Sequence, residues 1–113
     1  MFTIGDRYQK HCTDTTNTTA HVPYLRFDTF DDFRRCAPFD CVPVGVELTD
    51  AASSLVDYRH PMRAAYILGP EDGSLRAEIV DGCRDIIVIP SVHCLNVAVA
   101  GSIVMYDRLA KSR

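Results

Sequence analysis

The sequence has no long hydrophobic run, no excess of positive charge and no secretion signal. Its apolar segments are all much shorter than the roughly 20 residues that cross a bilayer. Residues 1–6 do not combine a basic stretch with an apolar one, as signal peptides do. The net charge is −3, from 12 Lys plus Arg and 15 Asp plus Glu. We therefore expect a cytoplasmic protein with no membrane partner, whose contacts with any nucleic acid are local rather than driven by its overall charge.

The spacing of cysteine and glycine argues against several further kinds of protein and binding site. The five cysteines include no C-x-x-C pair and are odd in number, so we expect reduced thiols rather than a disulfide framework. Cys36 and Cys41 have no His or Cys at zinc-finger spacing, and we expect no metal. The chain also lacks G-x-G-x-x-G and G-K-[ST], which leaves dinucleotide-binding and P-loop folds without support.

Four apolar segments have the length and composition of strands: Phe2–Ile4, Cys41–Leu48, Ala64–Leu68 and Asp85–Ile89. The last two are almost continuously apolar, as parallel strands covered on both faces are. A chain of 113 residues can hold one domain, residues 1–113. We predict an α/β fold with a mostly parallel, doubly wound sheet.

Three helices are expected around this sheet. Thr29 can cap a helix over Phe30–Arg35, and Ser74 can cap a second that reaches Cys83. The third, Leu95–Tyr106, is apolar all round, which predicts burial on more than one side. Because so small a domain cannot cover the whole helix, we expect a homodimer in which this C-terminal helix packs against its copy.

Two turns at strand ends carry candidate chemistry. Residues 68–75, LGPEDGSL, lead from a strand into a helix, at the carboxyl edge where α/β sheets bind ligands. A tight turn that only starts a helix explains the same residues. Residues 89–96, IPSVHCLN, offer hydroxyl, imidazole, thiol and amide groups before a helix N-terminus, which favours anions. His93 and Cys94 are adjacent and no third group is evident to orient them, so a packed thiol is favoured over a nucleophile.

The two turns together resemble two motifs of the SpoU (TrmH-type) RNA ribose methyltransferases of the SPOUT class. LGPEDGSL resembles the second motif of that family, and Ile89-Pro90 with residues 94–100, CLNVAVA, resembles the third. The interval of 20 positions from Gly69 to Ile89 also matches the family. The resemblance extends well over residues 41–111 and only loosely over the first forty.

The resemblance implies a SPOUT-like fold with a deep C-terminal trefoil knot, a dimer, and S-adenosylmethionine as the cofactor. Positions that match the family's cofactor-binding residues are Glu47, Leu68, Gly69, Ile89 and Leu95.

Three further positions match residues near the family's reacting centre. Glu71 matches the glutamate of the second motif, which is expected to hold a catalytic arginine in a bidentate pair. Asn96 matches the asparagine of the third motif. Cys94 stands where the family usually has serine, and a thiol is a poorer hydrogen-bonding group than a hydroxyl.

The family's first motif, which contains an asparagine and an arginine, has no match in this sequence, so the resemblance implies an N-terminally truncated domain. Such an arginine assists deprotonation of the ribose 2′-hydroxyl, and Arg7, Arg59 and Arg63 are the available substitutes. We expect an S-adenosylmethionine-dependent RNA methyltransferase that modifies the ribose 2′-oxygen of tRNA or rRNA. The alternative is a catalytically inactive, dimeric S-adenosylmethionine-binding remnant, and a flavodoxin-like scaffold without a knot is a third, weaker option.

Overall fold

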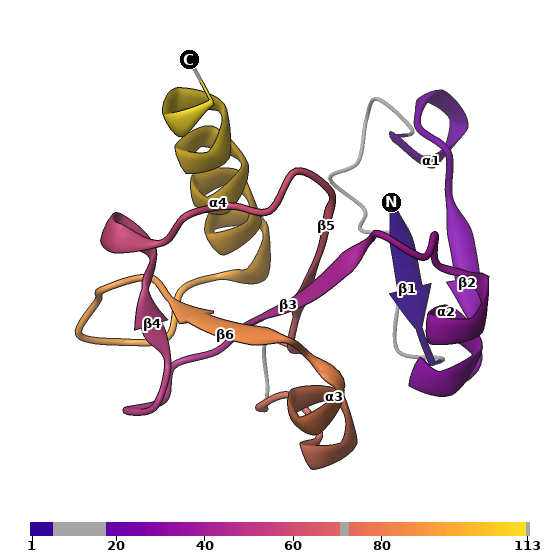
Figure 1. Cartoon of the computed structure of the whole chain (residues 1–113), viewed down its shortest axis with the longest axis horizontal. Coiled ribbons are helices and arrows are strands. Elements are labelled where there is room, and N and C mark those ends of the chain that lie inside the picture. Colours follow the sequence, from indigo (N-terminus) through magenta and orange to yellow (C-terminus); the bar gives the residue numbers. More distant parts are fainter. Residues whose placement is uncertain (6–17, 71–72, 113) are drawn as a thin grey trace. The chain divides into compact units, whose positions relative to one another are not determined.

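The computed structural model describes residues 1–5, 18–70 and 73–112 of the chain. Figure 1 shows its elements in chain order: β1 (Phe2–Ile4), α1 (Thr18–His21), β2 (Leu25–Phe27), α2 (Phe30–Cys36), β3 (Val42–Val46), β4 (Ser53–Ser54), the 3-10 helix η1 (Leu55–Asp57), β5 (Ala64–Leu68), α3 (Ala77–Gly82), β6 (Asp85–Val88) and α4 (Val97–Lys111). They form two compact units, Met1–Pro38 and Phe39–Arg113. Within the described ranges, none of the helices combines the length and apolarity needed to cross a membrane.

The first unit contains a two-stranded parallel sheet. β1 and β2 pair so that Phe2 lies opposite Leu25 and Ile4 lies opposite Phe27. Gly5 follows β1 with a φ of +84°, a conformation that costs glycine little and other residues much more. The predicted strand Phe2–Ile4 therefore exists, but it pairs with β2 instead of joining the larger sheet.

Helix α2 packs by its aromatic side chains within this first unit. The predicted cap is confirmed, because Thr29 Oγ1 accepts a hydrogen bond from the Asp32 N–H at 3.2 Å. Phe33 is buried and stacks on Phe2 with 4.5 Å between ring centroids. Phe27 meets Phe33 edge to face at 5.7 Å, an arrangement that aromatic quadrupoles favour.

The second unit contains a four-stranded sheet with the order β4-β6-β3-β5, in which every pair is parallel. β3 lies in the middle, with Val44 opposite Tyr66 of β5 on one side and Asp85 of β6 on the other. The parallel arrangement predicted for these three strands is confirmed. Because all the strands run the same way, β3, β5 and β6 have their carboxyl ends at one edge of the sheet.

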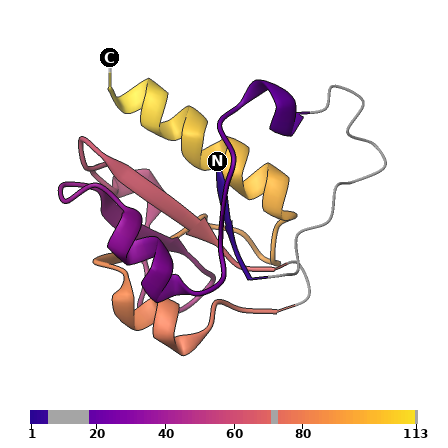
Figure 2. The ribbon, with the colours of Figure 1, turned by 90° about the vertical axis from the view of Figure 1, so that its right-hand side faces the viewer.

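One face of this sheet is covered by α4. Val44, Ile87 and Val104 are almost completely buried and form a core with Leu55 of η1. Figures 1 and 2 show α4 on one side of these strands and α3 on the other. Burial of each of these aliphatic side chains contributes roughly 1.5–3 kcal/mol, so this cluster is a main source of stability for the unit.

The opposite face of β3 is formed around Gly45. A Cβ at this position would lie only 2.7 Å from Ile86 Cδ1 and 3.3 Å from Leu75 Cδ1. The absence of a side chain there lets buried Leu75 approach the strand. The two-sided cover explains why β5 and β6 are continuous apolar runs in the sequence.

Two helix ends differ from the sequence prediction. The prediction that Ser74 caps α3 is wrong, because the helix begins at Ala77 after Arg76, which makes no side-chain cap bond. Helix α4 continues five residues past the expected end at Tyr106, to Lys111. Arg108 and Lys111 in its last turn stabilise this extension, because they donate hydrogen bonds to carbonyl oxygens of the segment before β5.

Candidate cofactor site

A cavity of about 270 Å³ lies at the carboxyl edge of the four-stranded sheet. Val46, Leu68 and Val88, the last residues of β3, β5 and β6, contribute to its wall. The remaining lining residues follow these strands in two turns and at the start of α4: Glu47, Leu48, Gly69, Pro70, Gly73, Ser74, Ile89, Ser91, His93, Cys94, Leu95, Val97 and Ala100. The cavity therefore occupies the edge of the sheet at which α/β folds bind ligands.

The turn after β5 folds back on itself beside the cavity. The Gly73 N–H donates to the Pro70 carbonyl oxygen at 3.3 Å, and the chain then returns to the end of β5. A Cβ on Gly69 would lie 3.2 Å from the Leu75 nitrogen and 3.4 Å from the Ser74 carbonyl carbon. These neighbours are backbone atoms that cannot rotate away, so the close approach requires glycine at position 69.

Glu47 joins this turn to the end of β3. Its backbone N–H donates to the Ile87 carbonyl at 3.0 Å, which fixes the residue to β6. Its carboxylate accepts two backbone hydrogen bonds, from Leu75 to Oε2 at 2.7 Å and from Leu48 to Oε1 at 3.1 Å. Among the described residues of the cavity wall, Glu47 is the only Asp, Glu, Lys or Arg.

The turn after β6 forms the other part of the wall. The Ser91 hydroxyl donates a short hydrogen bond to the His93 carbonyl oxygen and so closes the turn. Cys94 is an exposed thiol on the cavity wall. Leu95 follows it and also lines the cavity, so this turn presents one thiol, one imidazole and apolar side chains to the same space.

Asn96 begins helix α4. Its Oδ1 accepts hydrogen bonds from the N–H groups of Ala98 at 2.9 Å and Val99 at 3.4 Å. This N-cap satisfies backbone donors that have no partner within the helix. Asn96 stands directly beside the lining residues Leu95 and Val97 in the chain, but its own side chain is not part of the cavity wall.

The structure brings most of the residues singled out in the sequence to one place. All five expected cofactor residues line the cavity: Glu47, Leu68, Gly69, Ile89 and Leu95. Cys94 joins them, and Asn96 lies one residue beyond. Glu71 lies outside the described residues.

The arginines considered as substitutes for a catalytic arginine do not gather at this cavity. Arg63 is exposed and pairs with Asp40 at 3.1 Å. Arg59 lines a different cavity, before β5. Arg7 lies outside the described residues. Among the parts of the chain that the structure describes, the cavity wall therefore contains neither Arg nor Lys.

Several wall residues were not singled out as site residues in the sequence. Leu48, Ser91 and His93 line the cavity, yet the sequence gives no reason to prefer them over neighbouring residues. The contact between Glu47 and Leu75 was also missed, because it joins residues that are 28 positions apart. The only available signal was their position directly after strands that were predicted to be parallel.

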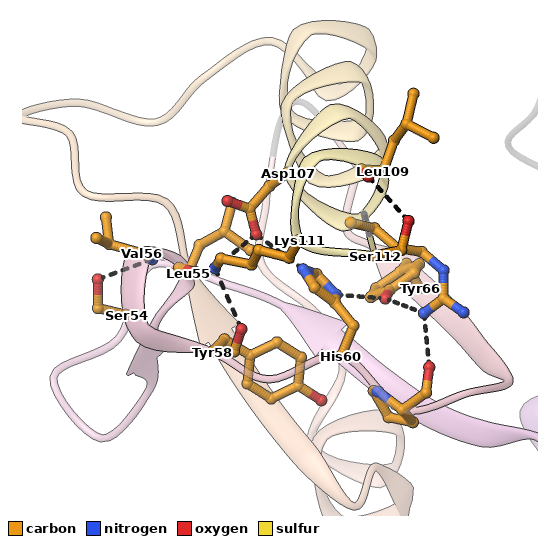
Figure 3. Close-up of polar contacts among 12 residues, drawn as sticks. Ser54, Leu55, Val56, Tyr58, His60, Tyr66, Asp107, Leu109, Lys111 and Ser112 are labelled. Atoms are coloured by element: carbon orange, nitrogen blue, oxygen red, sulfur yellow. Dashed lines mark hydrogen bonds and ion pairs between the residues drawn. The ribbon is translucent and has the colours of Figure 1, made fainter.

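A second cavity of about 530 Å³ lies at the other end of α4, beside a network of polar side chains. His60 is nearly buried and binds Asp107 through Nε2 at 2.8 Å and the Tyr66 hydroxyl through Nδ1 at 2.6 Å. Figure 3 shows these side chains between the last turns of α4 and the loop before β5. Arg108 donates to the Tyr66 hydroxyl at 3.0 Å, and Lys111 contacts Asp107 at 2.8 Å.

The same two cations bind backbone oxygens of the loop before β5. Arg108 donates to the carbonyls of Pro61 at 2.7 Å and Met62 at 2.6 Å. Lys111 donates to the carbonyls of Leu55 at 2.6 Å and Tyr58 at 3.1 Å. These bonds tie the end of α4 to carbonyl oxygens of η1 and of the loop before β5, and the cations also suit the negative end of the helix dipole. We call these side chains, His60, Tyr66, Asp107, Arg108 and Lys111, the α4 anchor.

The electrostatics of this edge reflect the same contacts. Burial raises the pKa of the Asp107 carboxyl, but hydrogen bonds from Lys111 and His60 more than offset burial and leave this pKa below its ordinary value. Hydrogen bonds from Arg84 and Tyr58 similarly lower the pKa of Asp85. We assign the anchor to structure, because its polar groups bind one another and the backbone.

Solved structures with folds similar to this chain include the following three. One protein, solved for structural insights into the 2-OH methylation of C/U34 on tRNA, has a TM-score of 0.75 and 21% identity over 99% of this chain and 79% of its own. The SpoU methyltransferase AviRb from Streptomyces viridochromogenes, in complex with the cofactor AdoMet, has a TM-score of 0.76 and 19% identity over 98% of this chain. A second AviRb structure gives the same score and identity over 97% of this chain. This chain spans about half the length of AviRb, since it covers 49% of that protein in both comparisons.

Sequence comparison agrees with the fold. No curated protein sequence matches the chain significantly. The model of the SpoU rRNA Methylase family matches residues 5–106, which is nearly the whole chain. This match confirms the family that the two turns predict, and the chain belongs to the SpoU rRNA methylase family.

Proposed function

We propose that this chain binds S-adenosylmethionine in the cavity and serves as the cofactor-binding part of an RNA methyltransferase that modifies the ribose 2′-oxygen of tRNA or rRNA. One observation carries the proposal: Glu47, Leu68, Gly69, Ile89 and Leu95 surround a single cavity, although they come from three strand ends. Family membership supports the reaction class, and the tRNA methylation studied in one similar structure supports the substrate class.

The cavity suits a nucleoside cofactor. Its volume of about 270 Å³ is close to the lower end of small-molecule sites, roughly 300 Å³, and it opens toward solvent. Aliphatic side chains such as Leu48, Leu68 and Ile89 offer a surface for an aromatic base. The close approach at Gly69 lets the returning chain of residues 73–75 pack against the end of β5 beside the cavity.

S-adenosylmethionine supplies a methyl group that its positively charged sulfur already activates, so the protein contributes mainly binding and orientation. We propose that the turns after β5 and β6 hold the cofactor between them. Asn96 then orients the substrate at the start of α4. Glu71 holds an arginine of the active site, and Cys94 takes the place of a serine hydroxyl.

We further propose that the chain forms a homodimer through α4. Ala100 and Val104 face the sheet of their own unit. The other side of the helix exposes a group of large apolar side chains: Val99, Ile103, Met105, Tyr106 and Leu109. Two copies that pack these faces together would remove them from water, and a stable monomer in sedimentation at micromolar concentration would contradict the proposal.

Two structural features implied by the family are part of the same proposal. The match to the family model spans residues of both compact units, which supports a single methyltransferase domain over residues 1–113. The C-terminal segment with α4 would thread the trefoil knot. The wall formed by the turns on both sides of α3 is consistent with a cofactor held in knotted loops.

Isothermal titration with S-adenosylmethionine and S-adenosylhomocysteine tests the cofactor site directly. We expect micromolar binding with one ligand per chain. Gly69→Ala should weaken it at least tenfold, because the new Cβ meets backbone atoms at 3.2 Å. Gly73→Ala is the matched control, because its Cβ would meet only Pro70 Cγ at an ordinary 3.8 Å. Equal weakening by both variants, or no binding by the unaltered protein, would contradict the proposal.

Transfer of a tritiated methyl group to bulk tRNA and rRNA tests the reaction. We expect incorporation above that of the double variant Glu71→Ala, Asn96→Ala. The alternative function, cofactor binding without turnover, is favoured by one observation: the described cavity wall contains neither Arg nor Lys to assist deprotonation. Binding without incorporation would support this alternative, and incorporation would end it.

A further inference from the structure

We propose that Glu47 is a positioning residue for the cofactor, whose carboxylate ties the turn of residues 69–75 to the end of β3 and so fixes the shape of the cavity. The proposal deepens the function proposed above and rests on it. It concerns a contact between backbone and side chain, and it assigns Glu47 no part in the methyl transfer itself.

The geometry makes Glu47 a bridge between two parts of the cavity wall. Its main chain is fixed to the sheet by the hydrogen bond to Ile87 at 3.0 Å. From there, its side chain reaches across the cavity wall and accepts a hydrogen bond from the Leu75 N–H at 2.7 Å. Leu48, the next residue, supplies the second donor at 3.1 Å. The carboxylate is therefore fixed at both oxygens.

Within residues 69–70 and 73–75 of the turn, which the structure describes, one internal hydrogen bond accompanies the bond to Glu47. Ser74 does not cap α3, and Arg76, at the cap position, makes no side-chain cap bond. The internal bond of the turn, from Gly73 to Pro70, is long at 3.3 Å. Leu75 is the last residue of the turn and is buried, so an unsatisfied N–H there would be costly. Glu47 supplies the acceptor that the turn itself lacks.

The position of this bond explains why it matters for the ligand. The Leu75 nitrogen is the atom that a Cβ on Gly69 would meet at 3.2 Å. The bond from Glu47 thus holds the returning chain against Gly69, a residue of the cavity wall. Without it, the turn could move away from β5, and the cavity would have to be reformed each time the ligand binds, which weakens affinity.

Glu47→Gln is the sharpest variant, because the amide keeps the size of the side chain but offers only one acceptor oxygen. Its NH₂ group would face either the Leu75 N–H or the Leu48 N–H, so one of the two hydrogen bonds is lost. A hydrogen bond to a charged group is typically worth about a tenfold change in an equilibrium constant. We therefore expect the dissociation constant for S-adenosylmethionine to rise about tenfold.

Glu78→Gln is the matched control. It removes a carboxylate from the adjacent helix α3. Glu78 is exposed, and its carboxylate lies 3.9 Å from the Arg76 guanidinium, so this ion pair contributes little. Both variants change the net charge equally, so a general electrostatic effect on a cationic ligand would appear in both. We expect Glu78→Gln to bind like the unaltered protein, within about twofold.

Two readouts distinguish positioning from general stability. In methyl transfer, Glu47→Gln should raise KM for S-adenosylmethionine about tenfold and leave kcat unchanged. In hydrogen exchange without ligand, the Leu75 amide should exchange at least tenfold faster in Glu47→Gln, whereas the Val104 amide in the core should not change. Faster exchange at both amides would indicate global destabilisation and overturn the proposal.

The outcomes separate this inference from the function on which it rests. If the unaltered protein binds S-adenosylmethionine and Glu47→Gln binds it equally well, the positioning role is wrong and the function stands. If the unaltered protein does not bind it, the function is wrong, and exchange at Leu75 alone decides whether Glu47 holds the turn. An unchanged Leu75 exchange rate overturns the proposal in either case.

Discussion

The two edges of the four-stranded sheet are built in opposite ways. At the carboxyl edge, apolar side chains and short turns surround a cavity, and one carboxylate, Glu47, accepts backbone N–H groups. At the opposite edge, where β3 and β5 begin and which we call the amino edge, charged side chains bind one another and backbone carbonyls. The residues that they join are far apart in the sequence. His60 to Asp107 and Lys111 to Leu55 are examples, 47 and 56 positions apart.

The difference indicates that the two ends of α4 have different roles: its start contributes to the cavity, and its end fixes the helix to the sheet. The helix begins at the cavity, where Asn96 Oδ1 caps it by accepting hydrogen bonds from the N–H groups of Ala98 and Val99. It ends at the α4 anchor, which ties it to the loop before β5. A helix fixed at its far end can present its first turn to a ligand in the cavity. The following predictions test this division from the strongest expected effect to the weakest.

The largest effect should come from His60→Ala at the anchor. The variant removes one hydrogen bond each from Asp107 and the Tyr66 hydroxyl, and it creates a cavity where the ring, only 6% exposed, had been. We expect a loss of about 2–4 kcal/mol in the free energy of unfolding, measured with urea. Affinity for S-adenosylmethionine, measured where the variant is folded, should not change. A large fall in affinity would mean that the two edges are coupled, and the comparison would fail.

A smaller effect on stability is expected at the other end of the helix. Asn96→Ala removes the N-cap and should cost about 1 kcal/mol of unfolding free energy. Asn96→Asp keeps the cap, so its stability should equal that of the unaltered protein. If Asn96 also orients the substrate, both variants should reduce methyl transfer. Full transfer by Asn96→Asp would restrict Asn96 to its structural role.

A pH-dependent effect is expected at Asp85. Because hydrogen bonds from Arg84 and Tyr58 lower its pKa in the folded state, Asp85 stabilises the protein above its unfolded pKa of about 3.9. This contribution disappears as the pH falls through the lower, folded pKa. In acid titrations of unfolding free energy, the difference between the unaltered protein and Asp85→Asn should therefore shrink below about pH 4, by at most about 1.4 kcal/mol per pH unit. A constant difference would contradict the assignment.

The smallest effect is expected at the exposed ion pair of the amino edge. Arg63 and Asp40 are 3.1 Å apart, but their side chains are 63% and 59% exposed. Water and salt screen such pairs, so Arg63→Ala should change the unfolding free energy by less than about 1 kcal/mol. A cost close to that of His60→Ala would show that charge at this edge matters more than burial.

The sequence predicts those parts of the fold that depend on local patterns. The continuous apolar runs of β5 and β6 follow from burial on both faces, and the Thr29 cap is a local bond. β2 and β4 have three and two residues, too few for a periodic pattern. They form because they pair with β1 and β6, and these partner strands are distant in the sequence.

The candidate site could be predicted as a place but not as a set of contacts. The edge of a parallel sheet and two motifs were enough to bring Gly69, Ile89 and Leu95 to one cavity. The Glu47 bond to Leu75 could not be predicted, and neither could the His60 bond to Asp107. Both join residues whose proximity exists only after the sheet has formed. The Ser74 cap failed for the same reason, because a distant carboxylate satisfies the turn instead.

The order of the strands has a consequence for how the molecule folds. Each parallel pair joins distant segments, such as Val42 with Ala64 and Val44 with Asp85, so forming the sheet requires closing long loops before many contacts are gained. Domains of this kind fold slowly in comparison with helical proteins of equal size. The cavity needs the ends of β3, β5 and β6 together with the first turn of α4, and it can only be a late product of folding. A chain that ended at residue 100 would contain both motifs but only the first turn of α4, without Val104, which packs in the core of the sheet.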